Sequence, residues 1–245
     1  MPEPTPPTAP AKKKRATPHD ISRETEDDIA LADQCAQAAA PIGIMALLTP
    51  RGWTDQEQSR LRGAVEQANT LVRQLRGLRS AKKTRTREEE TARTELLTAL
   101  DPILAGAKRT YPGDGDPNRA LFGVGQNLVN ESTSRLYRLT GETHQRLTAT
   151  GNKPPEFTLK GVTPAEIAAL AALTKKYKDA DFAQATALLN AADVLDQLNT
   201  HVTDIMNPLR RDLQLTADQQ WSYRNKDNRA KRLAFAIPAD RPAGE

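Results

Sequence analysis

Two long stretches of this chain begin and end alike, and this duplication limits the fold more than any other feature. Gly52-Trp53-Thr54 precedes a run that reaches Asp101-Pro102, and Gly161-Val162-Thr163 precedes a run that reaches Asn207-Pro208. The spacing from threonine to proline is 48 residues in the first copy and 45 in the second. Because leucine and alanine recur at helical spacing along both runs, the pattern predicts two long helices, each entered by a shorter one.

Both runs open with signals for a helix N-terminus. Thr54 with Glu57, and Thr163 with Glu166, have the spacing of a capping box, in which each side chain accepts a hydrogen bond from the other residue's backbone amide. Pro164 adds to the second signal, since proline is favoured in the first turn of a helix. In the first copy, Trp53 stands just before the cap, where it is placed to act as a hydrophobic staple.

Each run carries a seam, meaning apolar positions spaced three and four residues apart that would face a neighbouring helix. The first seam comprises Leu61, Ala64, Ala68, Leu71, Leu75 and Leu78, and it returns in phase at Ala92, Leu96, Ala99 and Ile103. The second comprises Ile167, Leu170, Thr174, Tyr177, Leu188, Ala191, Leu195, Leu198, Val202, Ile205 and Leu209. Polar residues interrupt both seams, at Lys82, Arg85 and Glu89 and at Asp181 and Gln184. The kept phase favours one continuous helix over 54–110 rather than a break near 80–87, in a bundle packed at its ends and looser in its middle.

The rest of the chain completes the predicted architecture. Asp20 is placed to cap a first helix, and Pro41 should kink or end it, since proline lacks an amide hydrogen. A third helix should start near Asn130, between Gly- and Pro-containing connections over 111–126 and 150–162. We expect an all-α fold, an antiparallel helical bundle of two tandem helical hairpins (19–110 and 117–215) with long second and fourth helices. Residues 1–18 should be a disordered Pro/Lys-rich tail, and 216–245 a basic, largely irregular one, with Thr216 to Trp221 as one more short helix.

Composition sets further bounds. One cysteine, Cys35, excludes an internal disulfide, and its place on an apolar helical face predicts a buried thiol. The longest apolar segment, Ala38 to Leu48, is shorter than the ~18 residues that a membrane helix needs, and no apolar signal-peptide region follows the basic cluster Lys12–Arg15. These observations lead us to expect a soluble cytoplasmic protein without membrane insertion.

A basic stripe is the most suggestive chemical feature. Residues 73–87 hold seven positive charges and no acid. Such a flank could contact phosphate backbones, and basic residues near Trp221, Tyr223 and Phe235 could add a second contact with base stacking. The candidate polyanion-binding residues are Arg73, Arg76, Arg79, Lys82, Lys83, Arg85 and Arg87, with Arg224, Lys226, Arg229, Lys231 and Arg232 near the C-terminus. The alternative is that they are solvated helix faces paired with acids such as Glu88–Glu90.

The sequence offers no catalytic, cofactor-binding or metal-binding set. A di-metal bundle needs Glu-x-x-His pairs, and none of the three histidines, His19, His144 and His201, follows a glutamate at that spacing. The Gly-x-Gly at Gly123 and Gly125 lacks the third glycine and the lysine of phosphate loops, so turn glycines are expected there.

Two classes of function remain in view, with an enzyme or a cofactor carrier a distant third. The leading expectation is a non-enzymatic structural or interaction protein, a scaffold or adaptor whose long helical faces bind a protein partner or a second copy. The alternative is a nucleic-acid-associated protein that binds phosphate backbones through Arg73–Arg87 and the basic tails. Any such binding would be salt-sensitive, because neither helix-turn-helix spacing nor an RRM-like aromatic motif supports base readout.

Overall fold

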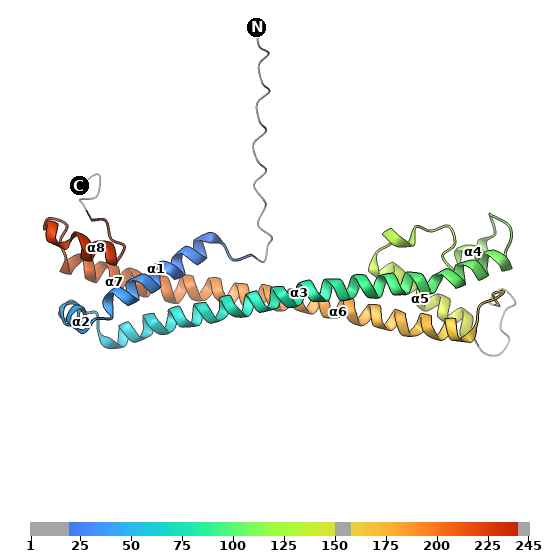
Figure 1. Ribbon diagram of the computed structural model, residues 1–245, viewed down its shortest axis with the longest axis horizontal. Helices are drawn as coiled ribbons and strands as arrows, with labels where there is room; N and C mark the ends of the chain where they lie inside the picture. The colour runs from blue at the N-terminus through green and yellow to red at the C-terminus, as the bar shows by residue number, and fades with distance from the viewer. Residues whose placement is uncertain (1–19, 150–157, 240–245) are drawn as a thin grey trace, which may run out of the picture. The chain divides into compact units, whose positions relative to one another are not determined.

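The structure is a computed structural model that describes residues 20–149 and 158–239, and within these ranges it is built of helices without any strand (Figure 1). The predicted all-α class is therefore confirmed. The chain divides into two compact units. Unit 1 combines Met1–Arg76 with Ala191–Glu245, and unit 2 is Gly77–Asn190. The expected disordered tail 1–18, the cluster Lys12–Arg15, His19, residues 150–157 of the second connection and residues 240–245 lie outside the described ranges.

Unit 1 packs the two ends of the described chain around one apolar core. Its elements are α1 (Arg23–Ala39), α2 (Ile42–Leu48), η1 (Thr49–Arg51), the first part of α3 (Asp55–Thr110), the end of α6 (Pro164–His201), the π-helical turn η4 (Val202–Met206), α7 (Asn207–Gln220), η5 (Lys226–Asn228) and α8 (Arg229–Ala234). Fully buried side chains from four of its segments, Cys35, Leu61, Leu198 and Leu213, meet in this core.

Local signals account for both ends of α1. Its cap is Ser22 rather than the predicted Asp20: the Ser22 hydroxyl accepts a 3.0 Å hydrogen bond from the Thr25 amide, the role that an N-cap side chain plays. At the other end α1 stops at Ala39, and Pro41 stands at the start of α2. The chain turns by 96° between α1 and the segment Ile42–Arg51. The predicted break at Pro41 is therefore confirmed.

Helix α3 is continuous for 56 residues and passes from unit 1 into unit 2, so the predicted single helix is confirmed. The capping box at its start is formed: the Thr54 amide donates to the Glu57 carboxylate at 2.7 Å, and the Glu57 amide donates to the Thr54 hydroxyl at 3.4 Å. Trp53 is fully buried, and its partner at the staple position is the polar residue Gln58. Pro102 lies inside the helix without ending it.

The second long helical run continues past Pro208 instead of ending there. Helix α6 passes into the π-helical turn Val202–Met206 and then into α7, whose second residue is Pro208. A π turn holds about one residue more than an α turn and so shifts which side chains face inward. Met206 is fully buried while Ile205 is 47% exposed, so the predicted inward position of Ile205 is wrong by one residue.

Unit 2 packs α4 (Pro117–Ala120), η2 (Leu128–Asn130) and α5 (Thr133–Thr148) against parts of α3 and α6. Here α3 and α6 run antiparallel, since Thr86 bonds to Gln184, Arg93 to Tyr177 and Glu95 to Lys176. The core of the unit includes Leu96, Leu100, Ile103, Leu136 and Leu170. Helix α5 begins at Thr133, after the cap Ser132, three residues beyond the predicted start near Asn130.

The interruption of the first seam is visible as a stretch of α3 without buried side chains. Every residue from Arg76 to Thr91 is exposed or half-buried, whereas Leu75 and Ala92 are buried. The buried apolar residues accordingly form two separate clusters, one in each unit.

The chain beyond residue 215 is more ordered than the sequence predicts. Helix α7 extends to Gln220, which absorbs the short helix expected over 216–221. Trp221 and Phe235 stack with ring centroids 5.2 Å apart, and both are buried in the core of unit 1 together with Ile237. These three apolar side chains pack the segment against the core of unit 1. The sequence predicted an irregular tail because most of the other residues of the segment are basic or polar.

Candidate functional site

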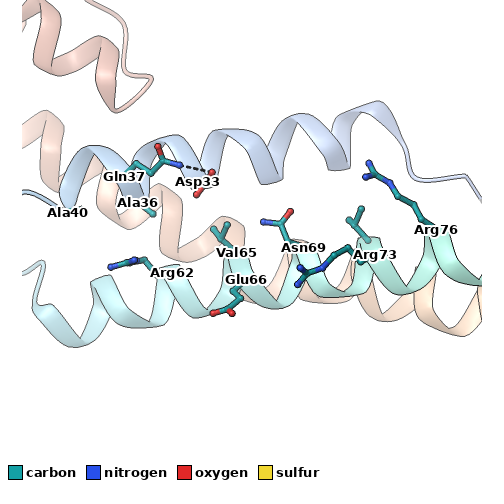
Figure 2. A pocket seen from close by; sticks show the side chains of 11 residues that line it. Asp33, Ala36, Gln37, Ala40, Arg62, Val65, Glu66, Asn69, Arg73 and Arg76 are labelled. Atoms are coloured by element: carbon teal, nitrogen blue, oxygen red, sulfur yellow. Dashed lines mark hydrogen bonds between the residues drawn. The ribbon is translucent and has the colours of Figure 1, made fainter.

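A groove between α1 and α3 is a concave surface of unit 1. Its volume is about 680 Å³, and α3 supplies seven of its eleven lining residues. Figure 2 shows α1 on one side and α3 on the other, with the side chains of Val65 and Asn69 directed from α3 towards α1.

The lining between the two helices consists of small or short side chains. Ala36 of α1 and Val65 and Val72 of α3 are buried at the base of the groove, while Ala40 is exposed at its end. The exposed Asn69 is the polar group that projects into the middle of this lining. Small side chains leave room for a foreign backbone to approach both helices closely.

Charged side chains form the edges of the groove. Three arginines on α3, Arg62, Arg73 and Arg76, stand against two carboxylates in the lining, Asp33 and Glu66. Asp33 accepts a 2.8 Å hydrogen bond from Gln37, and Glu66 points away from α1. The lining thus has one more positive than negative charge, and the excess lies on α3.

The arginines of the groove keep most of their hydrogen-bonding capacity. Arg73 donates to the Thr70 hydroxyl at 3.1 Å, which uses one of its five N–H donors. Arg76 lies 3.7 Å from Glu26, and both side chains are more than half exposed, so this pair contributes little to stability. A carboxylate or phosphate entering the groove could therefore be bound by two N–H groups of one guanidinium.

The predicted basic stripe falls into two parts. Arg73 and Arg76 belong to unit 1 and line the groove, whereas Arg79, Lys82, Lys83, Arg85 and Arg87 belong to unit 2. Arg85 pairs with Glu88 at 2.7 Å, the neutralised helix face that the alternative interpretation expects. Lys83 and Arg87 are exposed, and Arg79 and Lys82 are half-buried.

The C-terminal candidates separate into exposed and interior residues. Arg224, Lys226, Arg229 and Lys231 are exposed. Arg232 is 2% exposed; its guanidinium donates to the carbonyl oxygens of Trp221 and Pro238 and pairs with Asp218 at 2.6 Å. Arg232 therefore fixes the C-terminal segment from within and has no face for a polyanion. Trp221 and Phe235, which stack on each other in the core, are not open to a nucleic-acid base either.

In unit 2, polar side chains of α3 and α6 meet where Asp181 and Gln184 interrupt the predicted apolar seam. Gln184 donates to the Thr86 hydroxyl at 3.0 Å. Desolvation raises the pKa of Glu89 above its ordinary value, and the nearby Asp181 carboxylate raises it further. Desolvation and the nearby Asp181 carboxylate also raise the pKa of Tyr137, whose hydroxyl donates to the Tyr177 carbonyl oxygen at 3.3 Å.

The structure also locates the cysteine, histidine and glycine residues that were considered for other kinds of site. Cys35 is fully buried, so the predicted buried thiol is confirmed, and burial raises the pKa of this thiol to about 11. A ring nitrogen of His201 lies 2.8 Å from the Ala64 carbonyl oxygen, at the edge of the α3–α6 contact in unit 1. Gly123 and Gly125 have φ angles of 85° and 86°, as expected for turn glycines. Over residues 20–149 and 158–239, no three His, Cys, Asp or Glu side chains gather as metal ligands would.

Within the described residues, no single helix is both long enough and apolar enough to cross a membrane. Among the helices that the structure describes, one bent pair, Arg23–Ala39 with Ile42–Arg51, meets the length and composition criteria, and it does so jointly across its 96° bend. Comparison with protein-family models, with curated proteins and with solved structures found no match for this chain.

Proposed function

We propose that this protein is a non-enzymatic interaction protein, a scaffold or adaptor built from two tandem helical hairpins, and that it binds a helix of a protein partner in the α1–α3 groove. The observation that carries the proposal is the groove itself: small side chains at its base, charged residues at its edges, and two roughly parallel walls made by helices. Amphipathic helices bind in such grooves through anchors spaced three and four residues apart.

The groove also constrains what the partner helix carries. Ala36, Val65 and Val72 leave space for small or medium apolar side chains on the inward face. The arginines along α3 favour Asp or Glu on the flank that lies against α3, because a guanidinium binds a carboxylate through two parallel hydrogen bonds. The partner we propose is therefore an amphipathic helix with an acidic flank.

Blocking the groove tests this proposal. Asn69 is exposed and projects into the groove, so Asn69→Trp should fill it without disturbing the core. Gln67→Trp, at an exposed position of α3 that does not line the groove, is the matched control. We expect nuclease-treated extracts of the cells that make the protein to yield a partner with the wild type and Gln67→Trp but not with Asn69→Trp. Equal recovery by all three proteins would refute the assignment of the groove.

The alternative function, backbone-directed nucleic-acid binding, is supported by one specific observation: Arg73 and Arg76 stand on the same edge of the groove with donors to spare. Against it stand the Arg85–Glu88 pair, the interior position of Arg232 and the buried faces of Trp221 and Phe235. We therefore rank it second.

Salt dependence separates the two functions. Phosphate contacts release counterions, so backbone binding to a generic DNA duplex should weaken steeply between 50 and 200 mM salt, by roughly 10³-fold if about six phosphates are contacted. Reversing Arg73, Arg76 and Arg79 to glutamate should abolish it. Fluorescence anisotropy that shows no binding at low salt would eliminate this alternative and leave the protein partner.

A further inference from the structure

One face of α6 exposes two large apolar side chains that the two core clusters do not use. Phe182 and Leu189 are each 72% exposed, and they stand seven residues apart, which places them on the same side of the helix. The side chains that α6 buries, among them Leu170, Tyr177 and Leu198, point in the opposite direction by the same spacing. This outward face is therefore an apolar stripe with no function in the folding of the chain itself.

Four charged side chains lie in line with Phe182 and Leu189 and are ordered along the helix, while the exposed Asp179 stands at the edge of the same face. At about 100° per residue, the outward face continues to Lys175 and Lys178 in the N-terminal direction and to Asp193 and Asp196 in the C-terminal direction. All four side chains are exposed. Because α6 is one helix from Pro164 to His201, this order follows from its own register.

The order is self-complementary. Lys178 and Asp193 are equally distant in sequence from the midpoint between Ala185 and Thr186, as are Phe182 and Leu189. The same holds for Lys175 and Asp196. In an antiparallel copy of the helix, each lysine would consequently face an aspartate and each Phe182 would face a Leu189.

We propose that this face of α6 binds the same face of a second copy, in an antiparallel arrangement about a two-fold axis between Ala185 and Thr186. A two-fold interface uses one patch twice, and residue pairs must then be reciprocal, as they are in this register. Ala185 and Thr186 are small enough to let the two helices approach at the axis. A foreign partner would require no such symmetry, so the symmetric charge order selects a second copy as the occupant.

This dimer surface is separate from the α1–α3 groove and does not depend on the function proposed for the groove. Sedimentation velocity of the full chain over a wide concentration range is the primary measurement. We expect a monomer–dimer equilibrium that Phe182→Asp and Leu189→Asp each shift at least tenfold towards monomer. Val129→Asp is the matched control, since Val129 is 68% exposed in the same unit but lies outside α6.

A charge exchange tests the register as well as the surface. Lys178→Asp and Asp193→Lys should each weaken the dimer, because each places like charges opposite one another in both symmetry-related pairs. A mixture of the two single variants should dimerise again, since every pair then joins a lysine to an aspartate. This recovery is expected of the antiparallel register, and its absence would contradict it.

Cross-linking gives an independent readout of the axis. Ala185→Cys should form an intermolecular disulfide with its own copy under mild oxidation, whereas Lys175→Cys should not, because about 30 Å of helix separates position 175 from its counterpart. The buried Cys35 should not contribute. A strict monomer at the highest concentration, or a dimer unaffected by Phe182→Asp, would overturn the proposal. Asn69→Trp should leave the dimer unchanged, which keeps this test distinct from that of the groove.

Discussion

The indole N–H of Trp53 donates a 3.1 Å hydrogen bond to the side-chain oxygen of Gln58, inside the core of unit 1. The amide group of the same Gln58 donates at 2.7 Å to the Ala36 carbonyl oxygen in the last turn of α1. That carbonyl lacks its usual helical partner, because the Ala40 amide bonds to Gln37 instead. Gln58 thus satisfies two buried groups at once and joins α3 to the end of α1.

Gln58→Ala should be strongly destabilising for this reason. Removing the amide leaves the Trp53 N–H and the Ala36 carbonyl buried without partners, and each unsatisfied group costs about 1–3 kcal/mol. We expect a loss of at least about 2 kcal/mol in urea denaturation. Gln56→Ala, at an exposed position in the same turn, should change stability by no more than about 0.5 kcal/mol. Similar effects of the two substitutions would show that the buried bonds do not matter.

Local signals made the starts of the long helices predictable, whereas features that depend on contacts between distant segments could not be predicted from the sequence. The capping boxes at Thr54 and Thr163 are read from residues three positions apart, and both are formed. The sequence places Trp53 next to a cap. It does not show that Gln58, the partner of Trp53, also bonds to Ala36 of α1, because that bond depends on how α1 packs against α3. Ser22 caps α1 through Thr25, three residues further on, so this cap was a local signal that the choice of Asp20 missed.

Only part of the candidate site could be predicted from the sequence. The density of arginine on α3 drew attention to Arg73 and Arg76, which do line the groove. Their neighbours Arg62 and Asn69 lie outside the dense run, and the α1 wall of the groove is set by the packing of α1. Conversely, Arg232 matched the basic pattern, but its burial follows from the docking of Trp221 and Phe235, which no local pattern shows.

A single pair of substitutions tests the register shift at the π turn. The apolar spacing alone places Ile205 inward, whereas in the structure Met206 is fully buried and Ile205 is 47% exposed. Met206→Ala should therefore cost about 2–4 kcal/mol, because it leaves a cavity in the core of unit 1. Ile205→Ala should cost less than about 1 kcal/mol. If urea denaturation showed Ile205→Ala to be the more destabilising of the two substitutions, the inward position of Ile205 that the sequence favours would be correct.

The second capping box should make stability depend on pH at the acidic end. The Glu166 carboxylate accepts hydrogen bonds from the Thr163 amide at 2.7 Å and from its hydroxyl at 2.9 Å, and these bonds lower the pKa of Glu166 below 4.5. A carboxyl group whose pKa is lower in the folded state stabilises the fold above its unfolded pKa. That contribution is lost as the pH falls through the folded value.

Glu166→Gln retains an acceptor but cannot titrate, so it should remove this part of the acid dependence. Urea midpoints measured between pH 7 and pH 3 should fall less for Glu166→Gln than for the wild type. Thr163→Ala, which removes the cap itself, should cost about 1 kcal/mol at neutral pH. Parallel pH profiles for the wild type and Glu166→Gln would contradict the role assigned to the carboxylate.

Glu89 should behave in the opposite sense. Desolvation and the neighbouring Asp181 raise its pKa, so the charged form destabilises the folded state above that pKa. Glu89→Gln should therefore be neutral or slightly stabilising at pH 7, by no more than about 0.5 kcal/mol at this partly exposed position. The gain should vanish as the pH falls below the ordinary pKa of a glutamate, where the wild-type carboxyl is protonated in the folded and unfolded states alike. Glu66→Gln, at an exposed position of α3 that does not act on Glu89, is the control.

Cys35 should be nearly unreactive until the protein unfolds. Its S–H donates to the Phe235 carbonyl oxygen at 3.4 Å, and burial raises its pKa to about 11, so about one thiol in a thousand is ionised at pH 8. Maleimide labelling at pH 8 should become fast only across the urea transition, whereas an exposed thiol introduced by Gln67→Cys should label at once. Because the folded-state pKa lies above the unfolded one, the thiol's contribution to stability should be lost as the pH rises from about 9 to about 11. Cys35→Ala should lack that alkaline loss, and rapid labelling of the native wild type would show that Phe235 does not cover the thiol.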